Sequence, residues 1–286
     1  MRLRNSGLCK DENETDCHGK FDECTECAAV ISIDLSGKAI LLTGALGAIA
    51  EHLVRRLSAS GATLVLTDIR DEQDAKQLLD GWRIVPGSYV YFPADITDSG
   101  QVDRMVTAAF EKFPGLSTVI GHAGGCGLHP FASTKEAEFD RIFRFNFFAQ
   151  TYLARAVLAQ WVQRQIAGHL IFTSSYVARM PHTQISSYAS AKAALENFAR
   201  SLALEYAASG IRVNVVSPGN VAAGSSLRVF DEDPAYREFV LQVSLGKRSS
   251  PESVADAFVF LCSPLASEIN GHVFNPDNGT GIGYRL

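Results

Sequence analysis

The clearest chemical pattern in the sequence is a tyrosine and a lysine four residues apart, in Tyr188-Ala-Ser-Ala-Lys192. On a helix the two side chains share one face. Because a nearby ammonium favours phenolate over phenol, we expect Lys192 to lower the pKa of Tyr188 from its ordinary ~10, giving a general acid/base. A solvated helix face is the alternative. However, Ser175 lies thirteen residues earlier and could hold a substrate oxygen beside the phenol.

A glycine-rich turn precedes the first expected helix, in Thr43-Gly-Ala-Leu-Gly-Ala-Ile-Ala50. Gly44 permits a tight turn, and Gly47 lets the backbone approach a ligand closely. The helix N-terminus then presents N–H groups and a positive dipole end to a pyrophosphate. Close packing of strand and helix is the alternative explanation of these glycines.

An aspartate, Asp68, ends the second expected strand, 24 residues after Gly44. A carboxylate at this place accepts hydrogen bonds from ribose hydroxyls and repels a 2′-phosphate, which favours NAD over NADP. The alternative is an N-cap for the next helix. Arg70 follows closely and is the one base near this position.

Short apolar runs alternate with segments of helical spacing throughout residues 37–286. We expect strands at 38–43, 62–67, 89–92, 117–121, 169–173, 211–216 and 272–274, and helices at 47–60, 71–80, 99–112, 139–165, 187–208 and 251–262. No linker or internal repeat divides this region. The pattern therefore predicts one doubly wound, Rossmann-type α/β domain over residues 36–286, with a mostly parallel sheet flanked by helices.

The composition limits the classes of partner. The chain has 286 residues, 47% hydrophobic and 20% charged, which excludes a disordered or fibrous protein. A net charge of −5 provides no basic field for nucleic acid or an anionic membrane. No apolar run approaches the ~20 residues that span a bilayer. No secretory signal follows the first arginines, so we expect a cytoplasmic protein.

Residues 1–35 are expected to form a flexible extension, because they show neither helical nor strand periodicity. Four of the six cysteines lie there, at Cys9, Cys17, Cys24 and Cys27. These four could bind zinc, but their spacing lacks the paired arrangement of a strong zinc motif. We therefore predict no metal site, with zinc as the open alternative.

Taken in chain order, these residues resemble the markers of the compact, single-domain short-chain dehydrogenases/reductases (SDRs). The resemblance extends over residues 36–280 and is carried by Thr43-Gly44 with Gly47, Asp68, Asp95-Ile96, Ala123-Gly124, Asn146, Ser175, Tyr188 with Lys192, Asn214, Pro218-Gly219, Asn270-Gly271 and Asp277-Asn278-Gly279. It implies an NAD-dependent enzyme that interconverts an alcohol and a ketone or aldehyde by hydride transfer.

The resemblance also implies roles for individual residues. Tyr188 would exchange a proton with the substrate, Lys192 would lower its pKa and bind the nicotinamide ribose, and Ser175 would orient the carbonyl or alcohol. Asn146 would hold a water that relays protons to Lys192. The cofactor contacts expected are Gly44, Leu46, Gly47, Ile49, Asp68, Asp95, Ile96, Ala123, Gly124, Tyr188, Lys192, Pro218, Gly219 and Val221.

Several positions depart from the usual SDR pattern. The glycine turn of SDRs usually reads TGxxxGxG, which would put glycine at positions 48 and 50. This chain has Ala48 and Ala50 there, and Gly47 falls one residue early. His122 replaces an asparagine that ties strands together, and we expect it to supply the lost hydrogen bonds. Ala223 replaces a threonine that contacts the carboxamide. These departures affect the cofactor side of the expected site rather than its acid/base residues.

Residues 222–247 are expected to cap the substrate, a small-molecule alcohol or ketone. The apolar helices at 139–165 and 187–208 each need a second cover, which predicts a homo-oligomer, a tetramer or a dimer. Two rival functions remain. One is a catalytically silent nucleotide-binding protein that senses redox state or acts as a scaffold. The other is an NADPH-dependent reductase, which Asp68 opposes.

Overall fold

The computed structural model describes residues 32–242 and 245–283. Within them, seven parallel strands form one sheet in the order β3-β2-β1-β4-β5-β6-β7. The strands are β1 Ala39–Thr43, β2 Thr63–Asp68, β3 Tyr89–Pro93, β4 Thr118–Gly121, β5 His169–Thr173, β6 Arg212–Val216 and β7 Val273–Phe274. The doubly wound fold predicted from the alternating pattern is confirmed.

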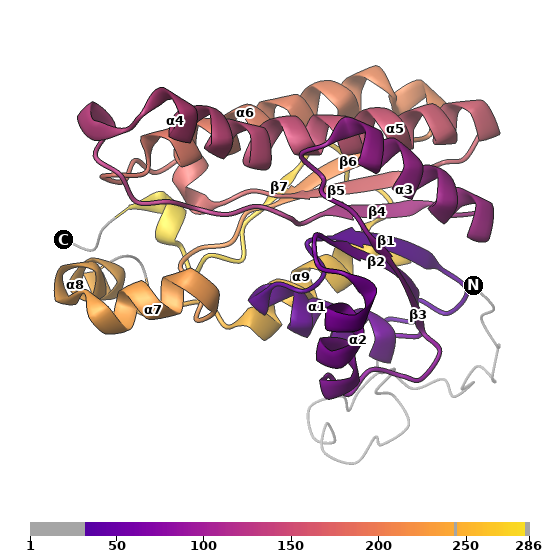
Figure 1. The fold of residues 1–286 in the computed structure, drawn as a ribbon, viewed down its shortest axis with the longest axis horizontal. Helices are drawn as coiled ribbons and strands as arrows, with labels where there is room; N and C mark the ends of the chain where they lie inside the picture. Colours follow the sequence, from indigo (N-terminus) through magenta and orange to yellow (C-terminus); the bar gives the residue numbers. More distant parts are fainter. Residues whose placement is uncertain (1–31, 243–244, 284–286) are drawn as a thin grey trace, which may run out of the picture. The chain divides into compact units, whose positions relative to one another are not determined.

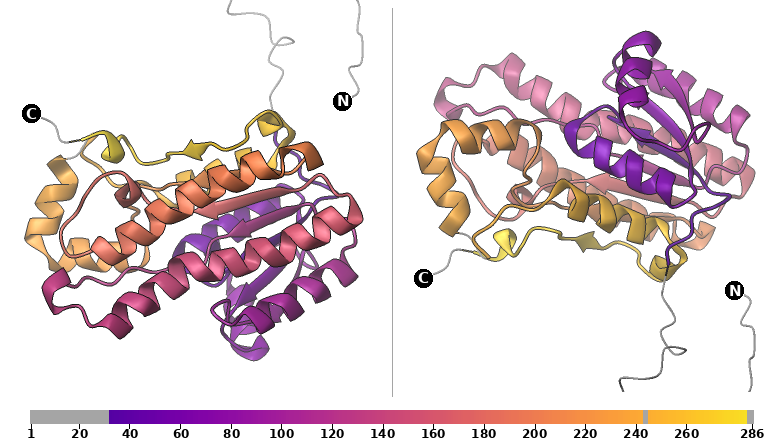
Figure 2. Two further views of the ribbon diagram at one scale, coloured as in Figure 1. Left: turned by 90° about the horizontal axis from the view of Figure 1, so that it is seen from above. Right: turned by 90° about the horizontal axis from the view of Figure 1, so that it is seen from below.

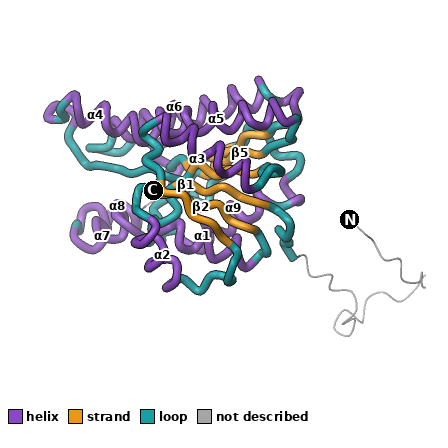
Figure 3. Tube along the Cα trace, turned by 45° about the vertical axis from the view of Figure 1, so that its right-hand side comes forward, coloured by secondary structure: helices purple, strands orange, loops and turns teal. Residues whose placement is uncertain are grey.

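Helices cover both faces of the sheet, as Figures 1 and 3 show. They are α1 Ala48–Ala59, α2 Glu72–Gly81, α3 Ser99–Lys112, α4 Glu136–Phe143, α5 Ala149–Arg164, α6 Ser186–Glu205, α7 Gly224–Glu232, α8 Pro234–Gln242 and α9 Pro251–Cys262. Helices α5 and α6 run side by side over one face, and α1 and α9 lie together on the other (Figure 2).

Two apolar cores lie on opposite faces of the sheet. One packs α3, α5 and α6 around residues such as Phe110, Trp161 and Phe172. The other packs α1 and α9 around residues such as Leu53 and Phe258. The strands are buried on both faces, which explains why they read as nearly continuous apolar runs in the sequence.

The single helix expected over 139–165 is instead three joined segments, with a π-helical turn, Arg144–Phe148, between α4 and α5. The amide of Asn146 donates from Nδ2 to the carbonyl of Ile142, four residues earlier, at 3.0 Å. A polar side chain that occupies a backbone carbonyl competes with the regular helical ladder. The expectation of one uninterrupted helix was therefore wrong at the residue with an expected chemical role.

The expected cap, residues 222–247, contains the two short helices α7 and α8, to which the sequence pattern gave no secondary structure. Asp233 accepts hydrogen bonds from the backbone N–H groups of Ala235 and Tyr236, and Pro234 begins α8. An aspartate followed by a proline is a known helix-start signal, and it could have identified α8. The predicted extension, residues 1–35, falls almost wholly outside the described residues.

Candidate active site

A cavity of about 940 Å³ lies where the loops leave the carboxyl ends of the strands. The strand order reverses between β1 and β4, and such a switch point is where doubly wound folds bind ligands. The cavity is lined by nearly all the residues proposed from the sequence: Gly44, Gly47, Ile49, Asp68, Asp95, Ile96, Ala123, Gly124, Ser175, Tyr188, Lys192, Pro218, Gly219 and Val221. Leu46 and Asn146 are the two that do not line it.

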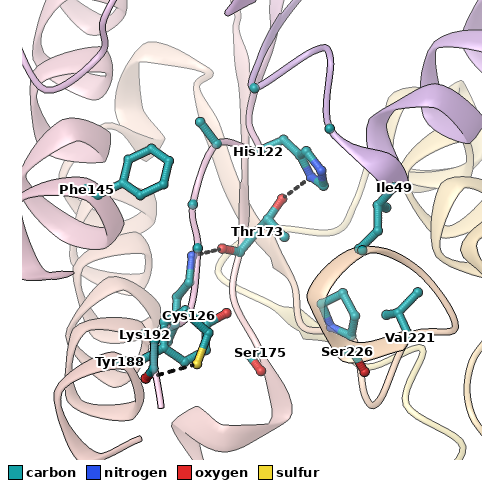
Figure 4. A pocket seen from close by; sticks show the side chains of 18 of the residues that line it. Ile49, His122, Cys126, Phe145, Thr173, Ser175, Tyr188, Lys192, Val221 and Ser226 are labelled. Carbon is teal, nitrogen blue, oxygen red and sulfur yellow. Dashed lines mark hydrogen bonds between the residues drawn. The ribbon is translucent and has the colours of Figure 1, made fainter. Parts of the chain in front are cut away.

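Ser175 follows β5, and Tyr188 and Lys192 lie in the first two turns of α6, so two neighbouring elements bring all three to one wall (Figure 4). The Lys192 ammonium lies 5.6 Å from the centre of the Tyr188 ring. It donates a hydrogen bond from Nζ to the backbone carbonyl of Thr173 at 2.8 Å. Its position is therefore fixed by the end of β5.

The ionisation of this pair is dominated by burial. Burial raises the pKa of Tyr188 well above its usual range; the nearby Cys126 thiol adds to this, and the Ser175 hydroxyl opposes it. Burial lowers the pKa of Lys192 to about 8, and the Cys126 thiol opposes this decrease. The expectation that the pKa of Tyr188 is lowered is wrong: the buried phenol is held in its protonated form.

Asn146 lies behind the cavity wall and is fully buried. Its side chain pairs with the backbone of Gly125, accepting from the N–H at 3.0 Å and donating to the carbonyl at 2.8 Å. A Cβ on the adjacent Gly124 would lie 2.9 Å from Asn146 Oδ1 and 3.0 Å from Lys192 Nζ. Glycine at 124 thus lets the loop after β4 pass between the asparagine and the lysine.

The glycine turn after β1 leaves the N-terminus of α1 open to the cavity. No side chain caps α1, whereas Asp71, Asp98 and Ser250 cap α2, α3 and α9. Gly44 has φ +66°, and a Cβ there would lie 2.6 Å from the backbone of Ala123. The uncapped end of α1 therefore offers N–H groups and a positive dipole end to an anion.

The two alanines in the turn differ in their surroundings. Ala50 is completely buried and does not line the cavity. Ala48 lines the cavity. Only one of the two departures therefore adds a methyl group where a pyrophosphate would lie.

Asp68 lines the cavity at the end of β2. Its carboxylate accepts hydrogen bonds from the backbone N–H groups of Leu46, at 3.1 Å, and Ile69, at 2.8 Å. The cap of α2 is Asp71, which removes the N-cap alternative for Asp68. Leu46 packs its side chain against the core and contributes its N–H to Asp68, so the expected cofactor contact from Leu46 is not at the cavity surface.

His122 ties β4 to β5 in place of the usual asparagine. Its Nδ1 lies 3.0 Å from the hydroxyl of Thr173, whose carbonyl accepts from Lys192 (Figure 4). Burial, with a smaller effect of Lys192, lowers the pKa of His122 to about 4. The ring is neutral near pH 7, so it can replace a neutral amide without adding charge.

The sequence analysis missed Cys126 and Asn220, which both line the cavity. Cys126 lies two residues beyond the Ala123-Gly124 marker, and Asn220 follows Pro218-Gly219, so position next to a marker was the available signal. From the expected cap and the loop after β5, Tyr176, His182, Arg228, Val229 and Tyr236 line the cavity. Met180 instead packs with Tyr176 and Val177 in a small core.

Known proteins share this fold over nearly the whole described region. A family model described as "Enoyl-(Acyl carrier protein) reductase" matches residues 44–281. The chain is 29% identical to 4-formylbenzenesulfonate dehydrogenase of Comamonas testosteroni (87% of this chain, 100% of the relative) and 27% identical to the 7alpha-hydroxysteroid dehydrogenase of Escherichia coli K12 (87% and 96%). The protein belongs to the SDR family.

A solved SDR from Brucella melitensis, described as a glucose/ribitol dehydrogenase, superposes with a TM-score of 0.79 at 26% identity, over 90% of this chain and all of that one. The protein is thus a nicotinamide-dependent oxidoreductase of the SDR family. The open end of α1, the close approach at Gly124 and the Asp68 carboxylate fit a dinucleotide along the cavity.

No described helix is long and apolar enough to cross a membrane. In the described part of the chain, no cluster of three metal-ligating side chains occurs.

Proposed function

We propose that this SDR interconverts a secondary alcohol and a ketone, or an alcohol and an aldehyde, with Ser175, Tyr188, Lys192 and Asn146 as its working residues. The observation that carries the proposal is the meeting of Ser175, Tyr188 and Lys192 on one wall of the cavity that begins at the open end of α1. A bound nicotinamide supplies or accepts the hydride.

Tyr188 would act as the acid in reduction, donating its hydroxyl proton to the developing alkoxide oxygen, and as the base in oxidation. Its raised pKa keeps the proton on the phenol at neutral pH, which suits the acid role in the free protein. Ser175 would hold the same substrate oxygen. The charge of Lys192 would favour the phenolate that forms when Tyr188 gives up its proton.

Lys192, with its pKa near 8, carries its proton at neutral pH. We assign it a second role, holding a ribose hydroxyl of the cofactor. Asn146 would position the Gly124-Gly125 turn beside Lys192, since its side chain both accepts from and donates to the backbone of Gly125. A water relay from Asn146 to Lys192 remains a prediction from the family resemblance.

The proposed cofactor is NAD rather than NADP. Each oxygen of the Asp68 carboxylate accepts one backbone N–H, Oδ2 from Leu46 and Oδ1 from Ile69, and the residue lines the cavity at the end where the adenosine ribose would lie. A carboxylate repels a 2′-phosphate and accepts from 2′- and 3′-hydroxyls. Asp95, Ile96, Ala123, Pro218, Gly219 and Val221 would border the remainder of the dinucleotide.

A turnover screen tests the proposal. Purified protein with NAD or NADP and a panel of secondary alcohols, sugars and hydroxy acids is followed by the absorbance of the reduced cofactor. We expect NAD-dependent oxidation of at least one CH–OH compound. Saturable NAD binding with no turnover across the panel would favour the silent nucleotide-binding protein instead.

The proposed assembly is a homo-oligomer, a tetramer or a dimer, formed through α5 and α6. Apolar side chains on this side of the molecule remain exposed: Phe148 at 45%, Val162 at 48% and Leu204 at 83%. Burial of such side chains against a second copy is favourable. Light scattering at micromolar concentration tests this, and a monomeric mass would contradict it.

A further inference from the structure

Part of the cavity has a polar lining that the proposed hydride-transfer chemistry does not use. It consists of Tyr176, Asn220 and Tyr236, which we call the polar wall. Tyr176 directly follows Ser175, Asn220 follows Pro218-Gly219, and Tyr236 comes from α8 in the cap. Three separate segments thus place two phenols and an amide beside the reacting residues.

Asn220 is the centre of this wall and is 3% exposed. Its side-chain oxygen accepts a hydrogen bond from the Tyr236 hydroxyl at 2.8 Å, and its backbone carbonyl accepts from Ser249 N–H at 2.8 Å. Its amide nitrogen Nδ2, by contrast, makes no hydrogen bond of good geometry, although the Asn220 side chain lies close enough to the Tyr176 hydroxyl to lower the pKa of that phenol. A buried donor without an acceptor is unfavourable, so an acceptor supplied by a ligand would be bound favourably.

The environment of Tyr176 shows that the wall adjoins the reacting residues. Burial, above all, raises the pKa of the Tyr176 hydroxyl; Tyr236, Cys126 and Tyr188 add to this, and Asn220 opposes it. The Tyr176 phenol is therefore within electrostatic reach of Tyr188 as well as of the amide. It can both donate and accept, so it suits a hydroxyl group on a ligand.

A second buried donor lies near the same segment. Arg248 precedes Ser249, and its guanidinium carbon lies 4.1 Å from the centre of the Phe230 ring. Its Nη1 is buried without an acceptor. Among the described residues only two other buried side-chain polar atoms lack a partner, and both are oxygens, on Thr67 and Gln150. Of these two nitrogen donors, Asn220 Nδ2 belongs to a residue that lines the cavity, whereas Arg248 does not line it.

We propose that the polar wall binds a second oxygen of the substrate, so that the natural substrate is a vicinal diol or its hydroxy ketone rather than a simple alcohol. The inference rests on the proposed function, since Ser175 and Tyr188 would hold the reacting oxygen. Asn220 Nδ2 would donate to the second oxygen, and Tyr176 would exchange a hydrogen bond with it. We take the second hydroxyl to lie on a neighbouring carbon, and the diols compared below test that placement.

The test compares cyclohexanol with trans- and cis-1,2-cyclohexanediol, which share one ring and differ by one hydroxyl. Wild-type protein with NAD is expected to oxidise the better diol with a kcat/KM at least tenfold above that for cyclohexanol. In Asn220→Leu and Tyr176→Phe, kcat/KM for the diol should fall at least tenfold further than for cyclohexanol. Tyr152→Phe, which removes a phenol of α5 outside the cavity lining, is the matched control and should preserve the ratio.

A binding measurement separates this inference from the proposed function. Calorimetry with saturating NADH compares the affinities of the same three compounds for the wild type and Asn220→Leu. Tighter binding of a diol that Asn220→Leu abolishes supports the polar wall even if no compound in the panel is oxidised, in which case only the proposed function fails. Equal affinities or equal kcat/KM values for diols and cyclohexanol would overturn the inference and leave alcohol oxidation intact.

Discussion

The two edges of the sheet each contain a buried histidine, and their surroundings differ. At the carboxyl edge, His122 contacts Thr173 and lines the cavity. At the amino edge, His169 begins β5 and lies between Asn214, at 2.9 Å, and Arg212, at 3.1 Å. Burial is the main cause that lowers both pKa values, to about 4 for His122 and about 3 for His169.

The amino edge is closed by hydrogen bonds within the chain. Arg212 donates to the carbonyls of Ala266 and Ile269, at 3.0 and 2.7 Å. Asn214 donates to Ile269 and accepts from the N–H of His272. The carboxyl edge instead contains the uncapped end of α1 and the amide nitrogen of Asn220, which lacks a hydrogen-bond partner.

In this fold, the polar residues that stabilise the chain and those available for chemistry lie at opposite ends of the strands. Polar groups satisfied within the chain contribute to the free energy of unfolding, whereas groups left without partners are available to a ligand. Substitutions at the amino edge should therefore change stability alone. Substitutions at the carboxyl edge should change turnover or specificity with little effect on stability.

The largest effect is expected for Tyr188→Phe. Loss of the general acid/base should reduce kcat by about 10²–10⁴-fold, while NAD binding and the melting temperature stay near wild type. Turnover and thermal melts are measured on the same preparation, with Tyr152→Phe as the control. More than a tenth of the wild-type rate in Tyr188→Phe would remove this residue from the chemistry.

Asp68→Ala should erode the preference for NAD over NADP by about tenfold or more, since tenfold corresponds to about 1.4 kcal/mol of removed repulsion. The ratio of kcat/KM values for the two cofactors is the measurement. Glu72→Ala, an exposed acid in the first turn of α2, is the matched control and should leave the ratio unchanged. A wild-type enzyme that already prefers NADP would contradict the assignment of Asp68.

At the amino edge, His169→Ala should lower the free energy of unfolding by about 2–3 kcal/mol, because it leaves a cavity and removes one buried hydrogen-bond partner each from Asn214 and Arg212. For a domain of this size the melting temperature should fall by about 5 °C or more. The kcat measured well below the melting temperature should remain within twofold. A comparable loss of kcat would show that the two edges are not separable.

Acid should weaken the fold through both histidines. Each is neutral when folded, and an unfolded histidine has a pKa near ~6.5. Their stabilisation is fully present above that pH and is lost as pH falls toward 4 for His122 and 3 for His169. Denaturant titrations at pH 7 and pH 5 give the free energy of unfolding. Between these two pH values it should fall by about 2 kcal/mol less in His122→Asn than in the wild type. An identical pH dependence would show that His122 is not buried as a neutral ring.

The smallest effect is expected for deletion of residues 1–30, which lie outside the described residues. No residue of the proposed site lies there, so kcat should stay within twofold and the melting temperature should be unchanged. The metal content of full-length protein purified under reducing conditions is measured in parallel. Near-stoichiometric zinc that disappears on truncation, with a lower melting temperature, would establish a site at Cys9, Cys17, Cys24 and Cys27.

Most of the sheet could be predicted from the sequence because its strands are short apolar runs bounded by glycines or by helical spacing. The strands begin and end within one residue of expectation, from Ala39–Thr43 to Val273–Phe274. Residues that follow the strands could be assigned to one cavity, since parallel strands bring their carboxyl ends to one edge. Asp68 and Ser175 could be placed at this edge without any knowledge of side-chain packing, whereas Gly219 was expected only from the resemblance to SDRs.

What could not be predicted depends on contacts between distant segments. The π-helical turn contains Asn146, whose side chain pairs with the backbone of Gly125, twenty-one residues away in the chain. The raised pKa of Tyr188 depends on burial and on Cys126, which the spacing to Lys192 does not reveal. That Asn220 Nδ2 lacks a partner could not be predicted either, because it depends on Tyr236 of α8, which donates to the Oδ1 of the same amide.

The π-helical turn at Arg144–Phe148 makes the length of this segment as important as its composition. Loss of one residue would allow a regular α-helix, but would rotate α4 by about 100° and shift it by about 1.5 Å relative to α5. Asn146 or its replacement would then no longer align with Gly125. A single-residue gap here in a related sequence would thus mark a different placement of the loop beside Lys192, even where every marker residue is retained.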